Sequence, residues 1–246
     1  MQLVKYFCLV LCCFSCIVSA VHKGSDTVVS AEPFFTFPAA DNDNVMVGFG
    51  WFKNGFALED ATTSCTFNSV YPVSGTVDLA GGTLYLLQDL TLPNTTELLG
   101  FGTIIGNGHN IYFGSQIAQM PSNIKLLENV NLFFHRNIDF VSSVTIQGNV
   151  LISGSGIALG LVDSAAFIID SNSSLTFKSV LLGNVHDDNI RCVDDTGHLI
   201  LDTLVWCQTG DMRYLYGDIL FQNNVNMYGD STFWYDSYMT CTIGRQ

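Results

Sequence analysis

Two acidic segments contain the residue types best suited to chemistry. They are His186-Asp187-Asp188-Asn189 and Asp194-Asp195-Thr196-Gly197-His198. Hydrolysis of a glycosidic bond needs two carboxyl groups beside that bond, one with a raised pKa so that it can act as an acid. If the protein is an enzyme, the catalytic candidates are Asp187, Asp188, Asp194 and Asp195.

A structural interpretation of the same segments is favoured. Neighbouring aspartates in an extended chain point to opposite faces, so a pair such as Asp194-Asp195 does not by itself place two carboxylates together. Both segments are typical of polar corners between strands. His135-Arg136 is interpreted in the same way, as a surface pair at a corner, with a carboxylate clamp as the alternative. No Cys/His spacing indicates zinc, and we expect neither a metal nor a cofactor.

A short motif recurs along the chain and predicts the elements that carry these corners. It reads apolar, any, apolar, polar, small polar, apolar, any, apolar, with Lys in the first position of one copy. The copies are Tyr85–Leu92, Lys125–Leu132, Leu175–Leu182 and Leu199–Trp206. The last two begin 24 residues apart. Val144–Gly154 and Ile219–Gly229 match each other even more closely, at an offset of 75, about three times that spacing.

The motif has the period of a β-strand, because side chains two residues apart share a face. The polar pair in its middle suits a corner at which the chain bends and the apolar phase resets. One such unit cannot bury its apolar face, whereas stacked coils cover one another and pair their strands in parallel. The sequence therefore predicts an all-β parallel solenoid. An antiparallel β-sandwich is the alternative, since it also has short, evenly spaced strands.

The segment Gly102–Ile111, GTIIGNGHNI, adds a resemblance to this prediction. It resembles the T-I-x-G-N-G-H-x-I rung of right-handed parallel β-helix proteins with the pectin-lyase-like fold. It is also similar to repetitive secreted or surface β-helix proteins of bacteria, including uncharacterised ones from intracellular bacteria. The resemblance implies a right-handed parallel β-helix from about Thr76 to the C-terminus and says little about a reaction.

Polygalacturonase-like members of that fold use paired aspartates and a Gly-His turn, and the resemblance to them is incomplete. Asp194-Asp195 and Gly197-His198 lie in one turn here, whereas the family spreads these motifs over successive rungs. The full Gly-His-Gly is absent, because Leu199 follows His198. A pectate-lyase mechanism would need a calcium cluster and a basic residue, for which Arg191 alone is insufficient.

Composition narrows the classes of partner. The chain has 246 residues, of which 48% are hydrophobic and only 13% charged, which excludes the disordered class. Its formal net charge is −13, so it would repel phosphate backbones and nucleic acid is not an expected partner.

The first 20 residues have the pattern of a signal peptide. Lys5 precedes the apolar run Tyr6–Val18, which is too short for an ordinary membrane span. The small residues Val18-Ser19-Ala20 predict cleavage between Ala20 and Val21. The alternatives are a retained anchor and lipidation at Cys16. We expect a secreted or cell-envelope protein with no transmembrane segment after the signal is removed.

Four cysteines remain after cleavage: Cys65, Cys192, Cys207 and Cys241. An even number in an exported chain permits disulfides, and Cys192 with Cys207 is the preferred pair, since about half a coil to one coil separates them. The alternative is that all four are small buried core residues.

Residues 21–75 differ from the rest and are expected to cap the open end of the solenoid. Asn54-Gly55 predicts a hairpin turn and Phe56–Cys65 a short helix. Residues 76–246 are expected to form the β-helix. The aromatic strand Phe233–Tyr238 is followed by no polar cap, which predicts a truncated or uncapped end, open to end-to-end self-association.

These patterns favour an exported, non-catalytic β-solenoid that acts as a surface, adhesion or structural scaffold. Its expected partner is a glycan or protein of a host or cell surface. One alternative is a carbohydrate-active enzyme, a polysaccharide hydrolase or lyase, on the same fold. Another is a glycan-binding module with exposed aromatics such as Trp51 or Trp234.

Overall fold

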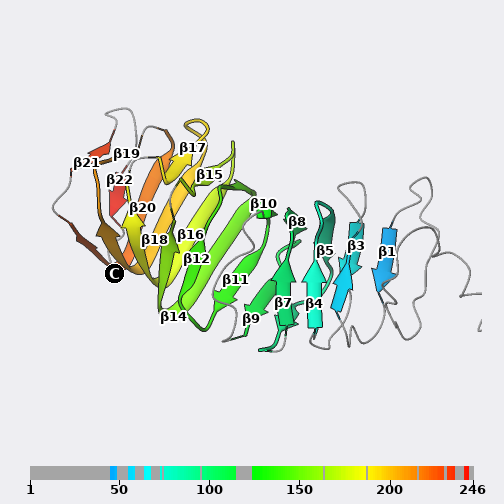
Figure 1. The fold of residues 1–246 in the computed structure, drawn as a ribbon. Coiled ribbons are helices and arrows are strands. Elements are labelled where there is room, and N and C mark those ends of the chain that lie inside the picture. The colour runs from blue at the N-terminus through cyan, green and yellow to red at the C-terminus, as the bar shows by residue number, and fades with distance from the viewer. Residues whose placement is uncertain are drawn as a thin grey trace, which may run out of the picture.

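Every strand pairing found in the described part of the chain is parallel, as stacked coils require. The computed structural model describes residues 45–48, 55–58, 64–67, 73, 75–94, 96–114, 124–162, 164–186, 188–214, 216–229, 232–235 and 241–243. These residues form an all-β solenoid of about seven turns, which confirms the predicted fold class and excludes the antiparallel sandwich (Figure 1).

Two long sheets make up most of the wall of the solenoid. The first sheet has the order β1 (Val45–Gly48), β3 (Ser64–Phe67), β5 (Thr83–Leu86), β8 (Gly102–Ile105), β10 (Ile124–Glu128), β13 (Val144–Gln147), β15 (Phe167–Ile169) and β17 (Ile190–Cys192). The second sheet has the order β6 (Leu90–Leu92), β9 (Asn110–Phe113), β11 (Asn131–Phe134), β14 (Asn149–Leu161), β16 (Ser174–Val185), β18 (His198–Gln208), β20 (Asp218–Tyr228) and β22 (Cys241–Ile243), with β12 (Ile138–Phe140) paired to β14.

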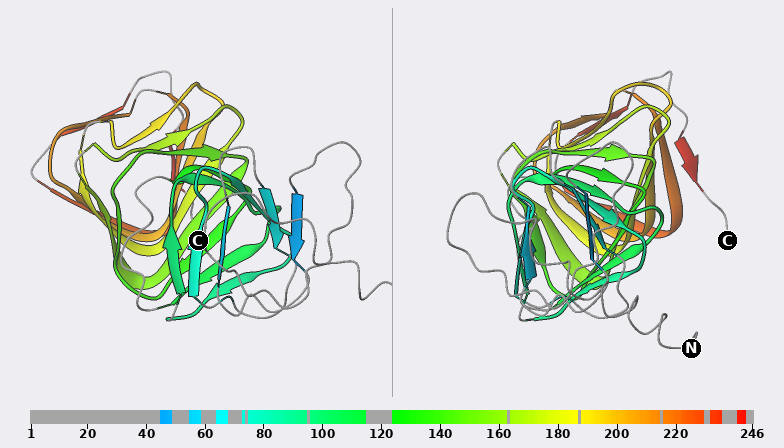
Figure 2. Two further views of the ribbon diagram at one scale, coloured as in Figure 1. Left: turned by 45° about the vertical axis from the view of Figure 1, so that its right-hand side comes forward. Right: turned by 90° about the vertical axis from the view of Figure 1, so that its right-hand side faces the viewer.

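Two smaller sheets complete the wall. One contains β2 (Gly55–Ala57), β4 (Gly75–Asp78) and β7 (Thr96–Leu99), and the other contains β19 (Met212–Tyr214) and β21 (Phe233–Tyr235). Within each sheet, neighbouring strands come from successive coils. The two turned views in Figure 2 show these coils stacked along one axis.

Strand register fixes the length of a coil. Leu175 of β16 pairs with Leu199 of β18, so the 24-residue spacing of these two motif copies is one coil, as predicted. Leu199 in turn pairs with Ile219 of β20, which makes the next coil 20 residues long. Coils therefore differ in length. The difference is absorbed between strands and also inside the long strands, as in the register shift between Ser153 and Ile157 of β14.

The offset of 75 between Val144–Gly154 and Ile219–Gly229, although about three times the 24-residue spacing, does not correspond to three whole coils. Val144 begins β13 in the first sheet, whereas Ile219 lies in β20 in the second sheet. The two segments thus occupy different sides of the coil. They look alike because a strand, a tight polar corner and another strand require the same residue types wherever they occur.

The motif's polar pairs do form corners, as the sequence predicts. Asn129, Ser179 and Thr203, the second members of three such pairs, have φ values of 45°, 55° and 52°. These left-handed values bend the strand and return the next apolar side chain to the interior. In β18 the bend separates buried Leu201 from buried Leu204.

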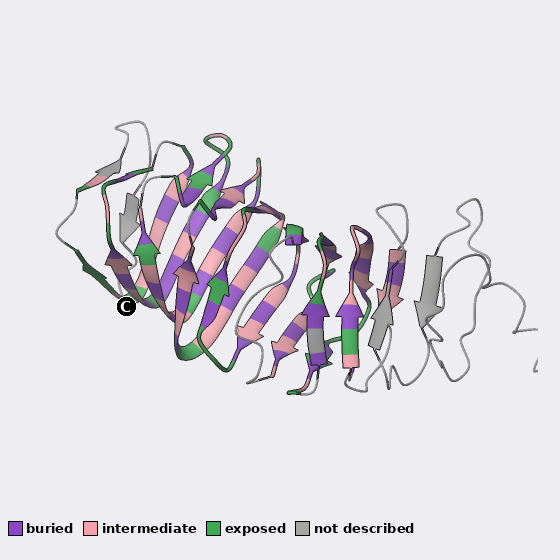
Figure 3. Cartoon of the chain, in the orientation of Figure 1, coloured by how far each residue is buried: buried purple, intermediate pink, exposed green. Residues whose placement is uncertain are grey.

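Alternate side chains of each strand fill the interior. In β11, Leu132 and Phe134 are buried while Asn131 and Phe133 are half-buried on the outer face. Figure 3 shows this alternation as bands of purple and pink along the strands. Burial of each such aliphatic or aromatic side chain contributes roughly 1.5–3 kcal/mol, so the coils are held mainly by this shared apolar core.

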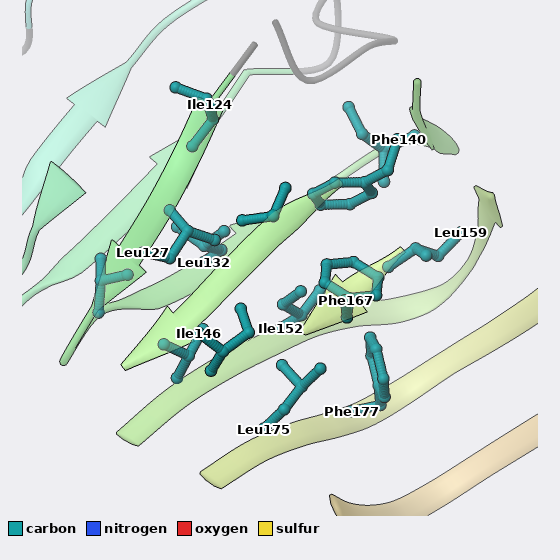
Figure 4. Packing of buried hydrophobic residues seen from close by; sticks show 14 of the residues in the cluster. Ile124, Leu127, Leu132, Phe140, Ile146, Ile152, Leu159, Phe167, Leu175 and Phe177 are labelled. Carbon is teal, nitrogen blue, oxygen red and sulfur yellow. The ribbon is translucent and has the colours of Figure 1, made fainter. Parts of the chain in front are cut away.

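Phenylalanines run through the core from coil to coil, and we call them the inner phenylalanine ladder. Its members are Phe113, Phe134, Phe140, Phe167 and Phe177. Phe113 and Phe134 are stacked with ring centroids 4.4 Å apart, and Phe140 and Phe167 meet edge to face at 4.8 Å. Figure 4 shows Phe140, Phe167 and Phe177 among the aliphatic side chains. Such pairs add stabilisation beyond the area that they bury.

Two local predictions for the N-terminal part are wrong. Asn54-Gly55 does not begin a hairpin, because β2 starts at Gly55 and pairs in parallel with β4. Phe56–Cys65 is not helical along its predicted length, because its two ends belong to strands β2 and β3, while residues 59–63 lie outside the described residues. Propensity signals over so few residues are overridden by pairing with the next coil.

The expected boundary between a cap over residues 21–75 and a solenoid over 76–246 stays a prediction. Strands β1, β2 and β3 lie in the first of these ranges and continue the parallel sheets of the later coils. The signal peptide, with its cleavage between Ala20 and Val21, lies outside the described residues, as does Trp51. The described part of the chain holds no helix with the length and apolarity that crossing a membrane requires.

Candidate functional site

The corner at which the chain leaves the first sheet and enters the second concentrates polar side chains. We call it the polar corner, and it consists of residues 87–89, 106–109, 129–130, 148, 170–173 and 193–197. Because the strands on both sides are in register, these segments stack on one another along the axis. Gly106 is required there: a Cβ at this position would lie 2.5 Å from the Cβ of Val130 in the next coil.

Backbone hydrogen bonds join the successive segments of the polar corner. The Gly106 N–H donates to the Glu128 carbonyl at 2.7 Å and the Gly108 N–H donates to the Asn129 carbonyl at 2.6 Å. In the other direction along the chain, the Asn131 N–H donates to the His109 carbonyl at 3.1 Å. The corner is therefore part of the continuous hydrogen-bonded wall rather than a set of independent loops.

The three catalytic candidates that the structure describes are divided between the two ends of β17. Asp188 is exposed in the turn before this strand, and Asp194 and Asp195 follow it in the polar corner, while Asp187 lies outside the described residues. Asn189 and Val193 flank the strand, and at about 3.3 Å per residue they are on the order of 13 Å apart. Glycosidase carboxyl pairs are at most about 9.5 Å apart, so Asp188 and Asp194 do not form such a pair within this coil.

Asp194 is engaged in holding the corner. Its carboxylate accepts hydrogen bonds from the Ser171 hydroxyl of the preceding coil, from the Thr196 hydroxyl at 2.6 Å and from the Thr196 N–H at 2.9 Å. The Thr196 hydroxyl oxygen accepts a further bond from the Asn172 N–H at 2.7 Å. The bonds from Ser171 and Thr196 lower the pKa of Asp194, the opposite of what a general acid needs.

Asn189 closes the turn that carries Asp188. Its side chain is 1% exposed and reaches into the wall. The amide oxygen accepts the His186 N–H at 2.7 Å, and the amide nitrogen donates to the Ala165 carbonyl of the preceding coil at 2.7 Å. One side chain thus satisfies a part-buried N–H and a buried carbonyl of the backbone, which is a structural role.

Asp202 is a buried carboxylate that the sequence analysis placed only at a corner. Its carboxylate lies 3.2 Å from the Lys178 ammonium and accepts a 3.0 Å hydrogen bond from the Thr203 hydroxyl, with a further bond from the Asn223 amide. Burial would raise the pKa of Asp202, but the hydrogen bonds from Asn223, Thr203 and Lys178 and the charge of Lys178 outweigh it, so the pKa is lowered.

This shift predicts a pH dependence of stability. Because the folded-state pKa of Asp202 lies below its ordinary value of 3.8, its ionised form stabilises the fold above about pH 4, and this contribution is lost as pH falls through the folded pKa. We expect Asp202→Asn to lower the free energy of unfolding by about 1 kcal/mol at pH 7 and by less at pH 3. Urea denaturation at both pH values measures this, with exposed Asp195→Asn as the control. A deficit that is the same at both pH values would contradict the prediction.

The predicted disulfide between Cys192 and Cys207 is not formed, and both residues are free cysteines. Cys192 of β17 is buried, and its thiol lies 3.0 Å from the Tyr214 hydroxyl. Cys207 of β18 follows buried Trp206 and faces outward. The two thiols therefore lie on opposite sides of the wall. Burial raises the pKa of Cys192 to about 11 and that of Cys65 to about 12, which makes both thiols poor nucleophiles.

Two hollows open on the outer surface. One of about 450 Å³ lies at the turn after β11 and is lined by His135, Arg136, Asn137, Asp139, Gly156 and Ile157. The predicted surface pair His135-Arg136 therefore lines this hollow. Within it, the Asn137 amide oxygen accepts the Ala158 N–H at 2.9 Å, which ties the turn to the next coil.

The second hollow, of about 440 Å³, lies where the polar corner meets the second sheet, and we call it the asparagine groove. It is lined by Asn107, Gly108, Asn129, Asn131 and Asn149. The sequence analysis identified Asn107-Gly108 only as part of the segment Gly102–Ile111, and Asn129 only as part of the polar pair in the motif copy Lys125–Leu132. The signal that it missed is the recurrence of asparagine about one coil apart, at 107, 129 and 149.

No protein-family model, curated protein or solved structure matches the chain. Within the described residues, no group of three or more His, Cys, Asp or Glu side chains is placed to hold a metal ion.

Proposed function

We propose that the protein is an exported, non-catalytic β-solenoid that acts as a surface, adhesion or structural scaffold. The observation that carries the proposal is the polar corner, in which side chains are hydrogen-bonded from one coil to the next. The contacts of Asp194 with Ser171 and of His109 with Asp89 are examples. A surface that is fixed in this way presents its polar groups at defined spacing, which suits binding more than chemistry that requires a mobile proton donor.

The sequence supports the location and the role. The pattern of Met1–Ala20 is that of a signal peptide, and Gly102–Ile111 resembles a rung of pectin-lyase-like β-helices and of bacterial surface proteins. In the fold, this segment forms β8, a tight turn and the start of β9. We propose a partner on a cell surface, either glycan or protein.

The alternative of a polysaccharide hydrolase or lyase has less support. Its best candidates are separated by β17, and hydrogen bonds lower the pKa of Asp194. A retaining or inverting glycosidase needs one carboxyl group that stays protonated beside the scissile bond.

The test combines turnover with binding. We expect the purified protein to release no reducing ends or unsaturated products from a panel of neutral and acidic polysaccharides, with or without calcium, and to bind intact cells or isolated envelopes. Asp188→Asn and Asp194→Asn are made in parallel and should bind as the parent does. Turnover that either substitution abolishes would overturn the non-catalytic assignment.

A further inference from the structure

We propose that the asparagine groove is a binding site for neutral glycans. The inference rests on the proposed scaffold function and names the chemistry of the ligand that this scaffold holds. The groove spans three successive coils, because Asn107 and Gly108 precede β9, Asn129 and Asn131 belong to the next coil, and Asn149 begins β14.

Each amide in the groove is fixed at one end by the protein. The Asn107 Nδ2 donates to the Leu86 carbonyl at 2.9 Å, and the Asn131 Nδ2 donates to the Asn110 Oδ1 at 2.9 Å and to the Gly108 carbonyl at 3.3 Å. The orientation of these two side chains leaves their Oδ1 atoms as acceptors for a ligand.

The amides of Asn129 and Asn149 are instead held through their oxygen atoms. The Asn129 Oδ1 accepts the Asn149 N–H at 3.0 Å, and the Asn149 Oδ1 accepts the Ser174 hydroxyl at 2.8 Å. Their Nδ2 groups remain as donors. The groove thus offers two amide acceptors and two amide donors that are oriented before a ligand arrives, which lowers the ordering cost of binding.

The lining contains no charged side chain, although the protein as a whole has a net charge of −13. A free anion would gain no countercharge in the groove, and a divalent cation would find no carboxylate ligand among its lining residues. Hydroxyl groups both donate and accept, so a polyhydroxyl ligand can use both kinds of amide end. These features together favour a neutral sugar.

An apolar surface lies beside the amides on the same outer face. Tyr112 is two residues from Asn110 on β9, and Phe133 is two residues from Asn131 on β11, so all four side chains project from one side of the sheet. The two rings stack with centroids 5.1 Å apart, and the Tyr112 hydroxyl lies 3.1 Å from the Asn110 amide. Amides next to aromatic carbon match a sugar ring, which carries hydroxyl groups at its edge and C–H groups on its faces.

The groove is open and periodic. A Cβ built on Gly108 would meet no atom within 4 Å, so space above the backbone is available to a ligand. Successive coils lie about 4.8 Å apart along the axis, close to the rise of one sugar in an extended chain. A glycan aligned with the axis would therefore meet a new amide with each residue.

The experiment uses the full-length protein and a matched asparagine elsewhere. Titration calorimetry is carried out with neutral cello-, xylo-, manno- and chito-oligosaccharides and with an acidic oligogalacturonide. The test variant is Asn131→Leu/Asn149→Leu, which removes an acceptor and a donor. The control is Asn226→Leu at an exposed position on β20. Circular dichroism melts confirm folding, and Asn149→Ala, at an exposed residue, replaces the double variant if it does not fold.

We expect at least one neutral oligosaccharide to bind, the double variant to lose tenfold or more in affinity and Asn226→Leu to bind as the parent does. Absence of neutral binding, binding of the acidic oligomer alone or equal affinity of parent and double variant would overturn the inference. Cell-surface binding that survives in the double variant would also overturn the inference and leave the scaffold function standing with a protein partner. Turnover of an oligosaccharide would instead contradict the scaffold function itself.

Discussion

Replacing Phe134 with alanine is expected to lower the free energy of unfolding by about 3–5 kcal/mol. Phe134 is 2% exposed and lies in the inner phenylalanine ladder, stacked on Phe113 at 4.4 Å and in edge contact with Phe140 at 6.5 Å. Its loss opens a cavity between coils that the stacked backbone cannot close, because the strands on both sides are held in register. Guanidinium denaturation followed by far-ultraviolet circular dichroism measures the effect.

The neighbouring residue supplies the control. Phe133→Ala removes the same atoms from the same strand, but Phe133 is half-buried on the outer face, where its ring stacks on Tyr112. We expect a loss of less than about 2 kcal/mol, since no interior cavity is formed. Equal losses for the two variants would show that the inward and outward faces of β11 are wrongly assigned.

Asn189→Ala is expected to lower the free energy of unfolding by about 2–4 kcal/mol. The variant leaves the His186 N–H and the Ala165 carbonyl without their side-chain partner, and each unsatisfied buried group costs about 1–3 kcal/mol. Differential scanning calorimetry should show a lower Tm, and hydrogen exchange should be faster in the turn before β17.

Asp188→Asn is the matched control for this prediction. Asp188 is the exposed neighbour with a φ of 63°, a conformation that asparagine adopts readily. We expect the free energy of unfolding to change by no more than about 0.5 kcal/mol. A loss as large as that of Asn189→Ala would mean that the turn is stabilised through Asp188 instead.

The architecture was predictable because apolar residues alternate along each strand and the motif recurs after one coil, and both patterns can be read in the sequence. Leu175 and Leu199 recur after one coil and pair in the structure. The same motif did not predict in which of the two long sheets a given segment lies. Val144 and Ile219 begin nearly identical segments in different sheets, since every corner calls for a small polar residue at its bend.

The side of the wall to which a side chain points was harder to predict than which strands pair with each other. The spacing of Cys192 and Cys207 gives their separation along the chain but not the side of the wall to which each thiol points. The asparagine groove was missed for a related reason. Asn107, Asn129 and Asn149 form a site only when three coils are stacked, and coils of unequal length hide the period. Trp51 and the side chain of Trp234, taken in the sequence as a glycan platform, lie outside the described residues.

Pairing only between successive coils has a consequence for how the chain acquires its structure. In the part of the chain that the structure describes, all paired residues are 19 to 25 positions apart, from Val45 with Ser64 to Asn149 with Ser174, although the chain has 246 residues. The entropy of loop closure is therefore set by one coil and does not grow with chain length. Two adjacent coils form the smallest nucleus, and each further coil can be added as it emerges from a ribosome, before the other terminus exists.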